Sequence, residues 1–172
     1  MKYISILVFI FILAGCASVE KVAKIATAKE TFITKFGDSL EIKYDSTGQL
    51  KNVVYTQVLS VEIDLPSVRR SKINRALSTA KVEVSSFIES QIETSDFSFL
   101  IEQTLSLSLL ESEQVKVLIK NLKKDFSSRK QEIIESLSLV NSVYNRHDKV
   151  IVATFSNVGV ARKLLDKINN YL

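Results

Sequence analysis

The sequence has a single cysteine, Cys16, and a single histidine, His147, so two common kinds of site are hard to build. One cysteine cannot close an intramolecular disulfide. A metal site would need carboxylates around that one histidine, and no acidic residues stand at a recognisable ligand spacing. His147 stands in a polar stretch beside Arg146 and Asp148, where we expect a solvated turn residue rather than a catalytic base. We therefore expect a protein that is not an enzyme and that carries no metal and no cofactor.

Glycine, proline and tryptophan are also scarce, with four, one and none among 172 residues. The scarcity of glycine and proline argues against loop-rich scaffolds and low-complexity linkers, and the sequence has no internal repeat. Gly37, Gly48 and Gly159 do not belong to phosphate-binding loops, and no G-x-S-x-G elbow is present. The length is that of one ordinary domain with a real core.

The first fifteen residues carry one charge, Lys2, followed by an apolar run from Ile4 to Ala14 that only Ser5 interrupts. A positive start, an apolar stretch of about ten residues and a small-residue exit are the parts of a secretory signal. The run is shorter than the roughly twenty apolar residues that span a bilayer. We predict a signal peptide over residues 1–15, and its removal takes Lys2 from the 23 basic residues and leaves 22 against 19 acidic ones.

The residues Leu13-Ala14-Gly15-Cys16 resemble the lipobox of bacterial lipoproteins. The resemblance implies that Cys16 receives a diacylglyceryl group and becomes the new N-terminus, with two or three acyl chains that give stable anchoring. The residues after the cysteine, Ala17 and Ser18, lack the aspartate that retains such proteins in the inner membrane. The resemblance therefore implies attachment to the outer membrane, facing the periplasm, and no contact with nucleic acid. The alternative is a cysteine that merely follows a signal peptide.

Residues 16–37 form the next segment, in which Val19, Val22 and Ile25 stand loosely at helical spacing and Gly37 supplies a helix stop. We predict a lipidated tether or a short helix here. An amphipathic helix that lies on the membrane is the alternative. Residues 38–172 are expected to form a single domain.

The domain begins with the pattern of a β-hairpin. Leu40, Ile42 and Tyr44 alternate with polar residues, a turn-forming run follows over 45–49, and a second alternation runs from Val53 to Ile63. Pro66 then suits the first turn of a helix, because a proline there loses no helical hydrogen bond. The apolar face of this predicted helix recurs at three- and four-residue steps and comprises Ile73, Ala76, Leu77, Ala80, Val84, Phe87 and Ile88. The two alanines would let the helix approach a sheet closely.

The second half of the chain continues this alternation of strands and helices. We predict a strand from Phe99 to Leu109, although helical spacing also fits that stretch, and an amphipathic helix over Glu111–Gln131. A second hairpin follows, with strands over Ile133–Tyr144 and Lys149–Phe155 around a polar turn. Ser156 or Asn157 can cap a final helix whose apolar stripe is Ala161, Leu164, Leu165, Ile168 and Leu172.

This order of elements predicts an α+β fold. Two hairpins and a middle strand would form an antiparallel or mixed sheet, with the amphipathic helices packed mainly on one face.

Four basic residues cluster at the start of the Pro66 helix: Arg69, Arg70, Lys72 and Arg75. They would form an anion-binding face for lipid head groups, lipopolysaccharide or peptidoglycan, or else a solvated side of the helix. Basic residues at a helix start mildly oppose the helix dipole, which favours asking whether they serve a partner.

The helix Lys72–Ile92 and the later stretch Glu132–Asn157 together resemble the LPP20-type lipoprotein domain, a group that includes a flagellar outer-membrane accessory lipoprotein. The shared pattern is an alanine-bearing helix beside a curved sheet, with a late hairpin of strand, polar turn and strand. The resemblance implies this fold, an envelope location and a non-enzymatic assembly role, and it carries no functional residue over.

We therefore expect an outer-membrane-anchored periplasmic lipoprotein that acts as an interaction or assembly module, as a homo-oligomer or within an envelope protein complex. The alternatives are a lipoprotein that binds glycan or lipid, and an exclusion or immunity lipoprotein of a mobile element.

Overall fold

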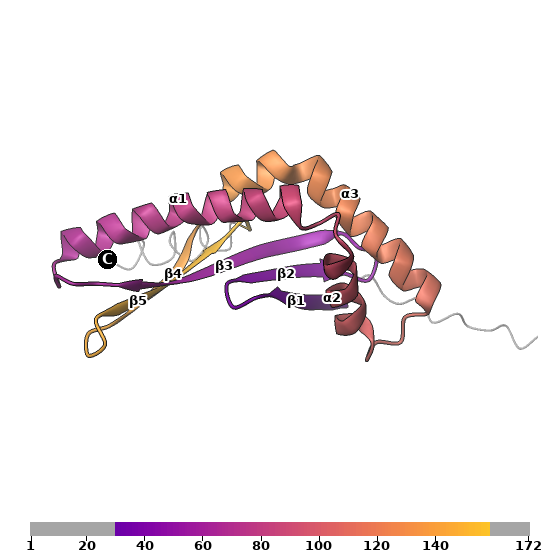
Figure 1. Ribbon diagram of the computed structural model, residues 1–172, viewed down its shortest axis with the longest axis horizontal. Coiled ribbons are helices and arrows are strands. Elements are labelled where there is room, and N and C mark those ends of the chain that lie inside the picture. The colour runs from indigo at the N-terminus through magenta and orange to yellow at the C-terminus, as the bar shows by residue number, and fades with distance from the viewer. Residues whose placement is uncertain (1–29, 159–172) are drawn as a thin grey trace, which may run out of the picture.

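The computed structural model describes residues 30–158, which fold as a sheet covered by helices. The elements are β1 (Thr31–Phe36), β2 (Leu40–Asp45), β3 (Leu50–Ser60), α1 (Pro66–Ser90), α2 (Ser95–Leu105), α3 (Ser112–Ser136), β4 (Ser138–Asn145) and β5 (Val150–Ser156). The strands form a five-stranded antiparallel sheet in the order β1-β2-β3-β5-β4 (Figure 1). The predicted α+β class is confirmed.

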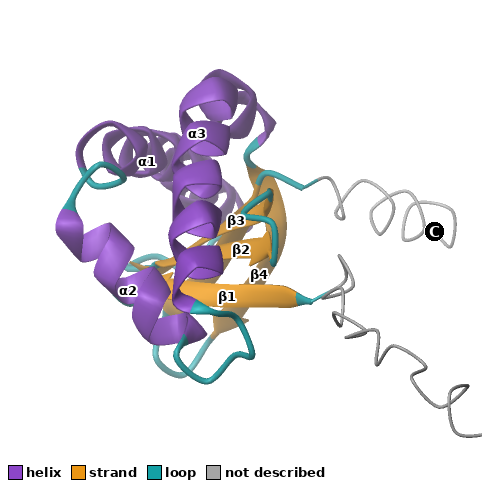
Figure 2. Cartoon of the chain, turned by 90° about the vertical axis from the view of Figure 1, so that its right-hand side faces the viewer, coloured by secondary structure: helices purple, strands orange, loops and turns teal. Residues whose placement is uncertain are grey.

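The helices of the described part lie together on one face of the sheet (Figure 2). Alternation explains which strand residues they cover, because Leu40, Ile42 and Tyr44 of β2 are buried while Glu41 and Lys43 between them are only half-buried. In β5 the buried apolar residues are Ile151, Ala153 and Phe155. The predicted hairpins β2–β3 and β4–β5 are both present, and β3 joins them by pairing with β5.

Helix α1 begins at Pro66 as predicted, and it packs on the sheet through small residues. Its buried residues recur every four positions: Ala76, Ala80, Val84 and Ile88. Four-residue spacing places one side chain above the next on the same face of a helix. Leu77 and Phe87, which were expected on this stripe, are half-buried at its margin.

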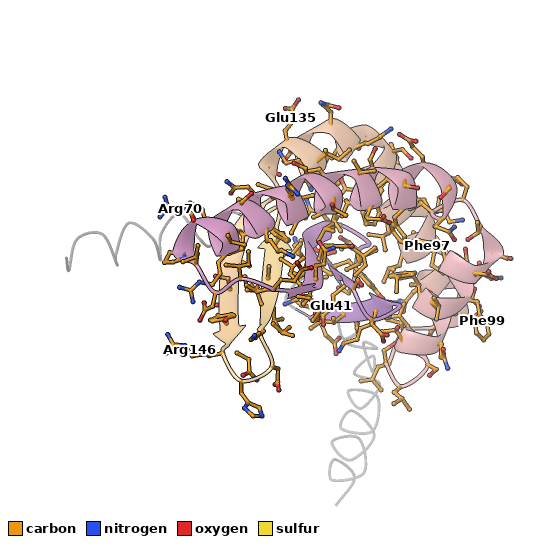
Figure 3. The ribbon with its side chains drawn as sticks, turned by 60° about the vertical axis from the view of Figure 1, so that its left-hand side comes forward. Glu41, Arg70, Phe97, Phe99, Glu135 and Arg146 are labelled. Atoms are coloured by element: carbon orange, nitrogen blue, oxygen red, sulfur yellow. The ribbon has the colours of Figure 1, made fainter. Side chains whose placement is uncertain are left out.

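The strand predicted over Phe99–Leu109 is wrong, because this stretch belongs to helix α2 and the loop that follows. Thr94 caps the helix, since its hydroxyl accepts a hydrogen bond of 3.2 Å from the backbone N–H of Phe97. Phe97, Ile101 and Leu105 are all buried at four-residue spacing, whereas Phe99 points away from the core (Figure 3). The four-residue period therefore indicates the secondary structure of this segment correctly, and the alternation does not.

Two further boundaries differ from the predictions. Residues 31–36, predicted to end a tether or short helix, form strand β1, which pairs with β2 through six residues. Residues 133–136, predicted as the start of a strand, continue α3, so that β4 begins only at Ser138. The predicted final helix and its apolar stripe lie outside the described residues, as do the signal peptide and the rest of the tether.

Candidate functional site

The four basic residues at the start of α1 do not form one face. Arg69 lies against the sheet, with its Nη1 3.3 Å from Asp64 Oδ1 and its guanidinium carbon 4.6 Å from the centre of the Tyr144 ring. Arg146, from the β4–β5 turn, contacts the other carboxylate oxygen of Asp64 at 3.6 Å. Arg69 is therefore occupied in tying α1 to the sheet.

Arg70 and Arg75 remain together on the solvent side of α1. They line a shallow polar depression with Ser67, Ser71, Asn74 and Ser78. Figure 3 shows Arg70 projecting from the end of the molecule that lies away from α2. Lys72 is half-buried and is not among the lining residues. The predicted set is thus split, and the chemistry that this surface offers is that of two arginines beside hydroxyl groups.

His147 occupies the β4–β5 turn, where it was expected, and its backbone rather than its ring is engaged. The side-chain oxygen of Asn145 accepts hydrogen bonds from the backbone N–H groups of His147 at 3.0 Å and Asp148 at 3.3 Å. His147 itself is exposed. Over residues 30–158, no three side chains of histidine, cysteine, aspartate or glutamate gather in a way that could hold a metal ion.

The face of the sheet opposite the helices carries an exposed apolar row that crosses three strands. Val58 of β3 pairs with Val152 of β5, which pairs with Val143 of β4. The three side chains are 66%, 39% and 56% exposed. Residues in register on neighbouring strands lie side by side on one face, so the three form a continuous valine row. This row was not among the sites predicted from the sequence, although the valines on the polar side of both hairpins were a signal for it.

Uncharged polar residues border the valine row. On one side Thr56 and Thr154 pair across β3 and β5, with their hydroxyl oxygens 3.4 Å apart. On the other side Ser60 and Asn145 flank Val150, which pairs with both. An apolar centre with a polar border is the usual composition of a surface that contacts another protein. Within the described part of the chain, no helix covers this face (Figure 2).

A second apolar surface lies at the end of the molecule where α3 begins. Leu110, Val117 and Leu118 line a groove of about 440 Å³ there, which Ser46 and Thr47 of the β2–β3 turn close on the other side. Leu107 and Leu109, in the loop before α3, are 97% and 94% exposed. This end therefore presents apolar side chains both in a hollow and on a protruding loop.

The β2–β3 turn beside this groove is held by the buried carboxylate of Asp45. Asp45 Oδ1 accepts hydrogen bonds from the backbone N–H of Thr47 at 3.0 Å and of Gln49 at 3.1 Å, and Oδ2 lies 2.8 Å from the Lys51 ammonium. Burial alone would raise the pKa of Asp45, but the hydrogen bonds and the Lys51 charge outweigh it and lower the pKa to about 2. The turn is thus held by an ionised side chain at neutral pH.

Comparisons of the chain with protein-family models, with curated proteins and with solved structures found no match. The resemblances to the lipobox and to the LPP20-type domain stay predictions, and Cys16 lies outside the described residues. Among helices of residues 30–158, none combines the length and the apolar character needed to span a bilayer.

Proposed function

We propose that this chain is an outer-membrane-anchored periplasmic lipoprotein whose domain works as a non-enzymatic interaction module. The observation that carries the proposal is the exposed valine row formed by Val58, Val152 and Val143 on the face of the sheet that no helix of residues 30–158 covers. A sheet that buries one face under helices normally exposes polar residues on the other. Three apolar side chains in register there would be removed from water by a partner that covers them, which supports an interaction role.

The anchor is supported by the sequence around Cys16. An apolar run, two small residues and the only cysteine of the chain stand in the order that a lipid-modified N-terminus requires. Two acyl chains exceed the marginal hold of one chain and keep a protein on a bilayer. The domain then needs only to bind neighbours that are confined to the same envelope.

The partner that fits the valine row has a flat apolar strip and few charges, because the residues in register beside the row carry no charge. A second copy of this chain meets that description, since the row can face its own equivalent across a two-fold axis. A different envelope protein with an exposed aliphatic strip is the other form of the same proposal. Both bury the valines without leaving a charge unpaired.

The anchor is tested by the substitution Cys16→Ala in the native host. Intact mass of the wild-type protein should show loss of residues 1–15 and a mass increase of a diacylglyceryl group and an acyl chain. The variant should carry no lipid mass, because it has no sulfur to receive the diacylglyceryl group. An unmodified thiol on an uncut wild-type chain would overturn the anchor.

The interaction role is tested by Val58→Lys, with Val82→Lys as the matched control. Both valines are 66% exposed, but Val82 lies on α1 rather than on the sheet. Val58→Lys should abolish the complexes that chemical cross-linking traps in envelopes, or weaken self-association about tenfold or more, since a charge within an apolar contact is desolvated without a partner. Equal behaviour of the two variants would contradict the assignment of this face.

A second candidate function is the binding of an anionic glycan or lipid head group, and the pair Arg70 and Arg75 beside serine hydroxyls favours it. Guanidinium groups suit phosphate and carboxylate groups. Replacing both arginines by glutamine should remove any shift in melting temperature that lipopolysaccharide or peptidoglycan fragments cause. A wild-type melting temperature that no such ligand changes would exclude this function.

A further inference from the structure

The loop between α2 and α3 holds two leucines almost entirely in water. Leu107 is 97% exposed and Leu109 is 94% exposed, while Leu110 next to them packs against the core. Single apolar residues on a surface are ordinary, but two leucines at nearly full exposure in one short loop indicate a contact surface. Folding of the described domain gives neither side chain a place in the core.

This leucine loop, residues 106–111, is held in shape by its own serines. The Ser106 hydroxyl donates to the backbone carbonyl of Gln103 at 2.7 Å, and the Ser108 hydroxyl donates to that of Leu105 at 2.6 Å. The Ser108 N–H also donates to the Leu105 carbonyl, at 2.9 Å. Both serine hydroxyls are therefore already paired with carbonyls at the end of α2, and neither loses a hydrogen bond when water is removed from around it.

The leucine loop lies at the same end of the molecule as the start of β1 (Figure 1). Thr31, the first residue of β1, pairs with Asp45, the last residue of β2. The next two residues, Ser46 and Thr47 of the β2–β3 turn, line the same groove as Leu110. Thr34 of β1 also donates a hydrogen bond of 2.9 Å to Thr104, near the end of α2. Thr31, the first residue of β1, therefore lies at the same end of the fold as Leu107 and Leu109.

We propose that this end of the domain rests on the bilayer that holds the acyl chains of Cys16, with Leu107 and Leu109 inserted among the lipid head groups. The proposal rests on the lipid anchor proposed above. Thr31 stands fifteen residues after Cys16, and a chain of that length reaches about 50 Å at most. The anchor on Cys16 thus keeps the leucine loop close to the membrane surface. Because the loop's effective concentration at the membrane is then high, a small apolar contact is enough to orient the domain.

The positive and negative charges near the leucine loop are balanced, so the loop has little electrostatic attraction to a membrane surface. Glu111 and Glu113 stand at the start of α3, and Lys116 and Lys120 follow within two turns. Lys116 Nζ lies 2.7 Å from Glu113 Oε1, so one charge of each sign is already paired. Electrostatic attraction to anionic lipid is therefore a minor contribution. The docking is apolar, and we expect it to be insensitive to salt.

The test uses the full lipidated protein reconstituted in phosphatidylethanolamine and phosphatidylglycerol vesicles. Because acylation removes the thiol of Cys16, a cysteine introduced by Leu107→Cys is the only one that a fluorescent dye can label. Ile63→Cys is the matched control, since Ile63 is also an exposed aliphatic residue. It follows the end of β3 that lies away from the β2–β3 turn, and a strand of eleven residues is about 33 Å long. Nitroxide-labelled lipids then report which dye lies at the bilayer.

The lipids should quench the dye at residue 107 about twofold or more, at low and high salt alike, and leave the dye at residue 63 unchanged. No quenching at 107 on protein whose acyl mass is present overturns the docking but not the anchor. Equal quenching at both positions also overturns it, because the domain then has no preferred orientation. A dye at 107 that is shielded from water but not quenched shows that residues 17–29 or a second copy cover the loop instead, which again overturns it. Protein without the acyl mass overturns the anchor and the docking together.

Discussion

Asp125 on α3 accepts a hydrogen bond of 2.8 Å from the backbone N–H of Leu50, the residue at which β3 begins. Arg129, one turn further along α3, donates to the carbonyl of the same leucine at 3.3 Å and lies 3.5 Å from the Asp125 carboxylate. Both backbone groups of Leu50 are thus satisfied by side chains from a helix more than seventy residues away in the sequence. This arrangement fixes α3 against the start of β3.

The first prediction concerns this contact. Asp125→Ala should lower the free energy of unfolding by about 1–3 kcal/mol, because the partly buried N–H of Leu50 loses its acceptor. Urea denaturation followed by circular dichroism measures the change. Glu113→Ala removes an exposed partner of Lys116 on the same helix and should leave the midpoint unchanged. A loss of similar size in both variants would show that the contact to Leu50 contributes nothing specific.

The second prediction compares two glycines, both of which adopt a left-handed backbone. Gly37 has φ +61° and open space around it, whereas Gly48 has φ +81° and a Cβ there would lie 2.2 Å from the backbone oxygen of Leu118. Gly37→Ala should cost only the left-handed conformation, about 1–2 kcal/mol. Gly48→Ala should cost clearly more, because the β2–β3 turn and α3 must also separate. Melting temperatures of the two variants decide, and an equal decrease would contradict the close approach at Gly48.

The third prediction concerns pH. The pKa of Asp45 is lowered from 3.8 to about 2 in the folded chain, so its ionised form stabilises the fold above pH 4, and this stabilisation is lost as the pH falls from about 4 to 2. Asp45→Asn should therefore be less stable than the wild type at pH 7, by about 2 kcal/mol. The difference should shrink towards pH 2. Denaturant midpoints of both proteins across this range provide the measurement, and a difference that is independent of pH would refute the role of the charge.

The fourth prediction tests how closely α1 approaches the sheet. Ala80 is fully buried, so Ala80→Leu should overpack the interface and cost about 1–3 kcal/mol. Val82→Leu, on the exposed side of the same helix, adds volume where there is space and serves as the control. If Ala80→Leu were as stable as that control, the contact between α1 and the sheet would be looser than the structure describes.

The sequence predicted the elements in which one pattern was dominant. The four-residue spacing of Ala76, Ala80 and Val84 predicted α1, and the alternation from Leu40 to Tyr44 predicted β2, because these patterns match the periods of a helix and a strand. Segment 95–105 shows both periods at once. Its helix is decided by the Thr94 cap and by burial of Phe97 against Phe126, 6.3 Å away between ring centres. That contact joins distant segments, so a local pattern cannot show it.

The surfaces proposed as functional were less visible in the sequence than the fold. The four basic residues were predicted as one group. Arg69 is separated from Arg70 and Arg75 because it contacts Asp64 and Tyr144, and Tyr144 lies on the distant strand β4. The valine row depends on register, because Val58, Val152 and Val143 lie side by side only when β3 pairs with β5. The sequence shows two hairpins but not which of their strands become neighbours.

The strand order has a consequence for how the chain reaches its native state. Asn157 accepts a hydrogen bond of 2.7 Å from the N–H of Val53, across a separation of 104 residues. The late hairpin β4–β5 therefore completes the sheet only after nearly all of residues 30–158 are available, and closing so large a loop makes this step slow. Until then β3 has an unpaired edge that accepts any compatible strand. Two chains that meet in that state can exchange their late hairpins, and the exchange would join them as an intertwined pair.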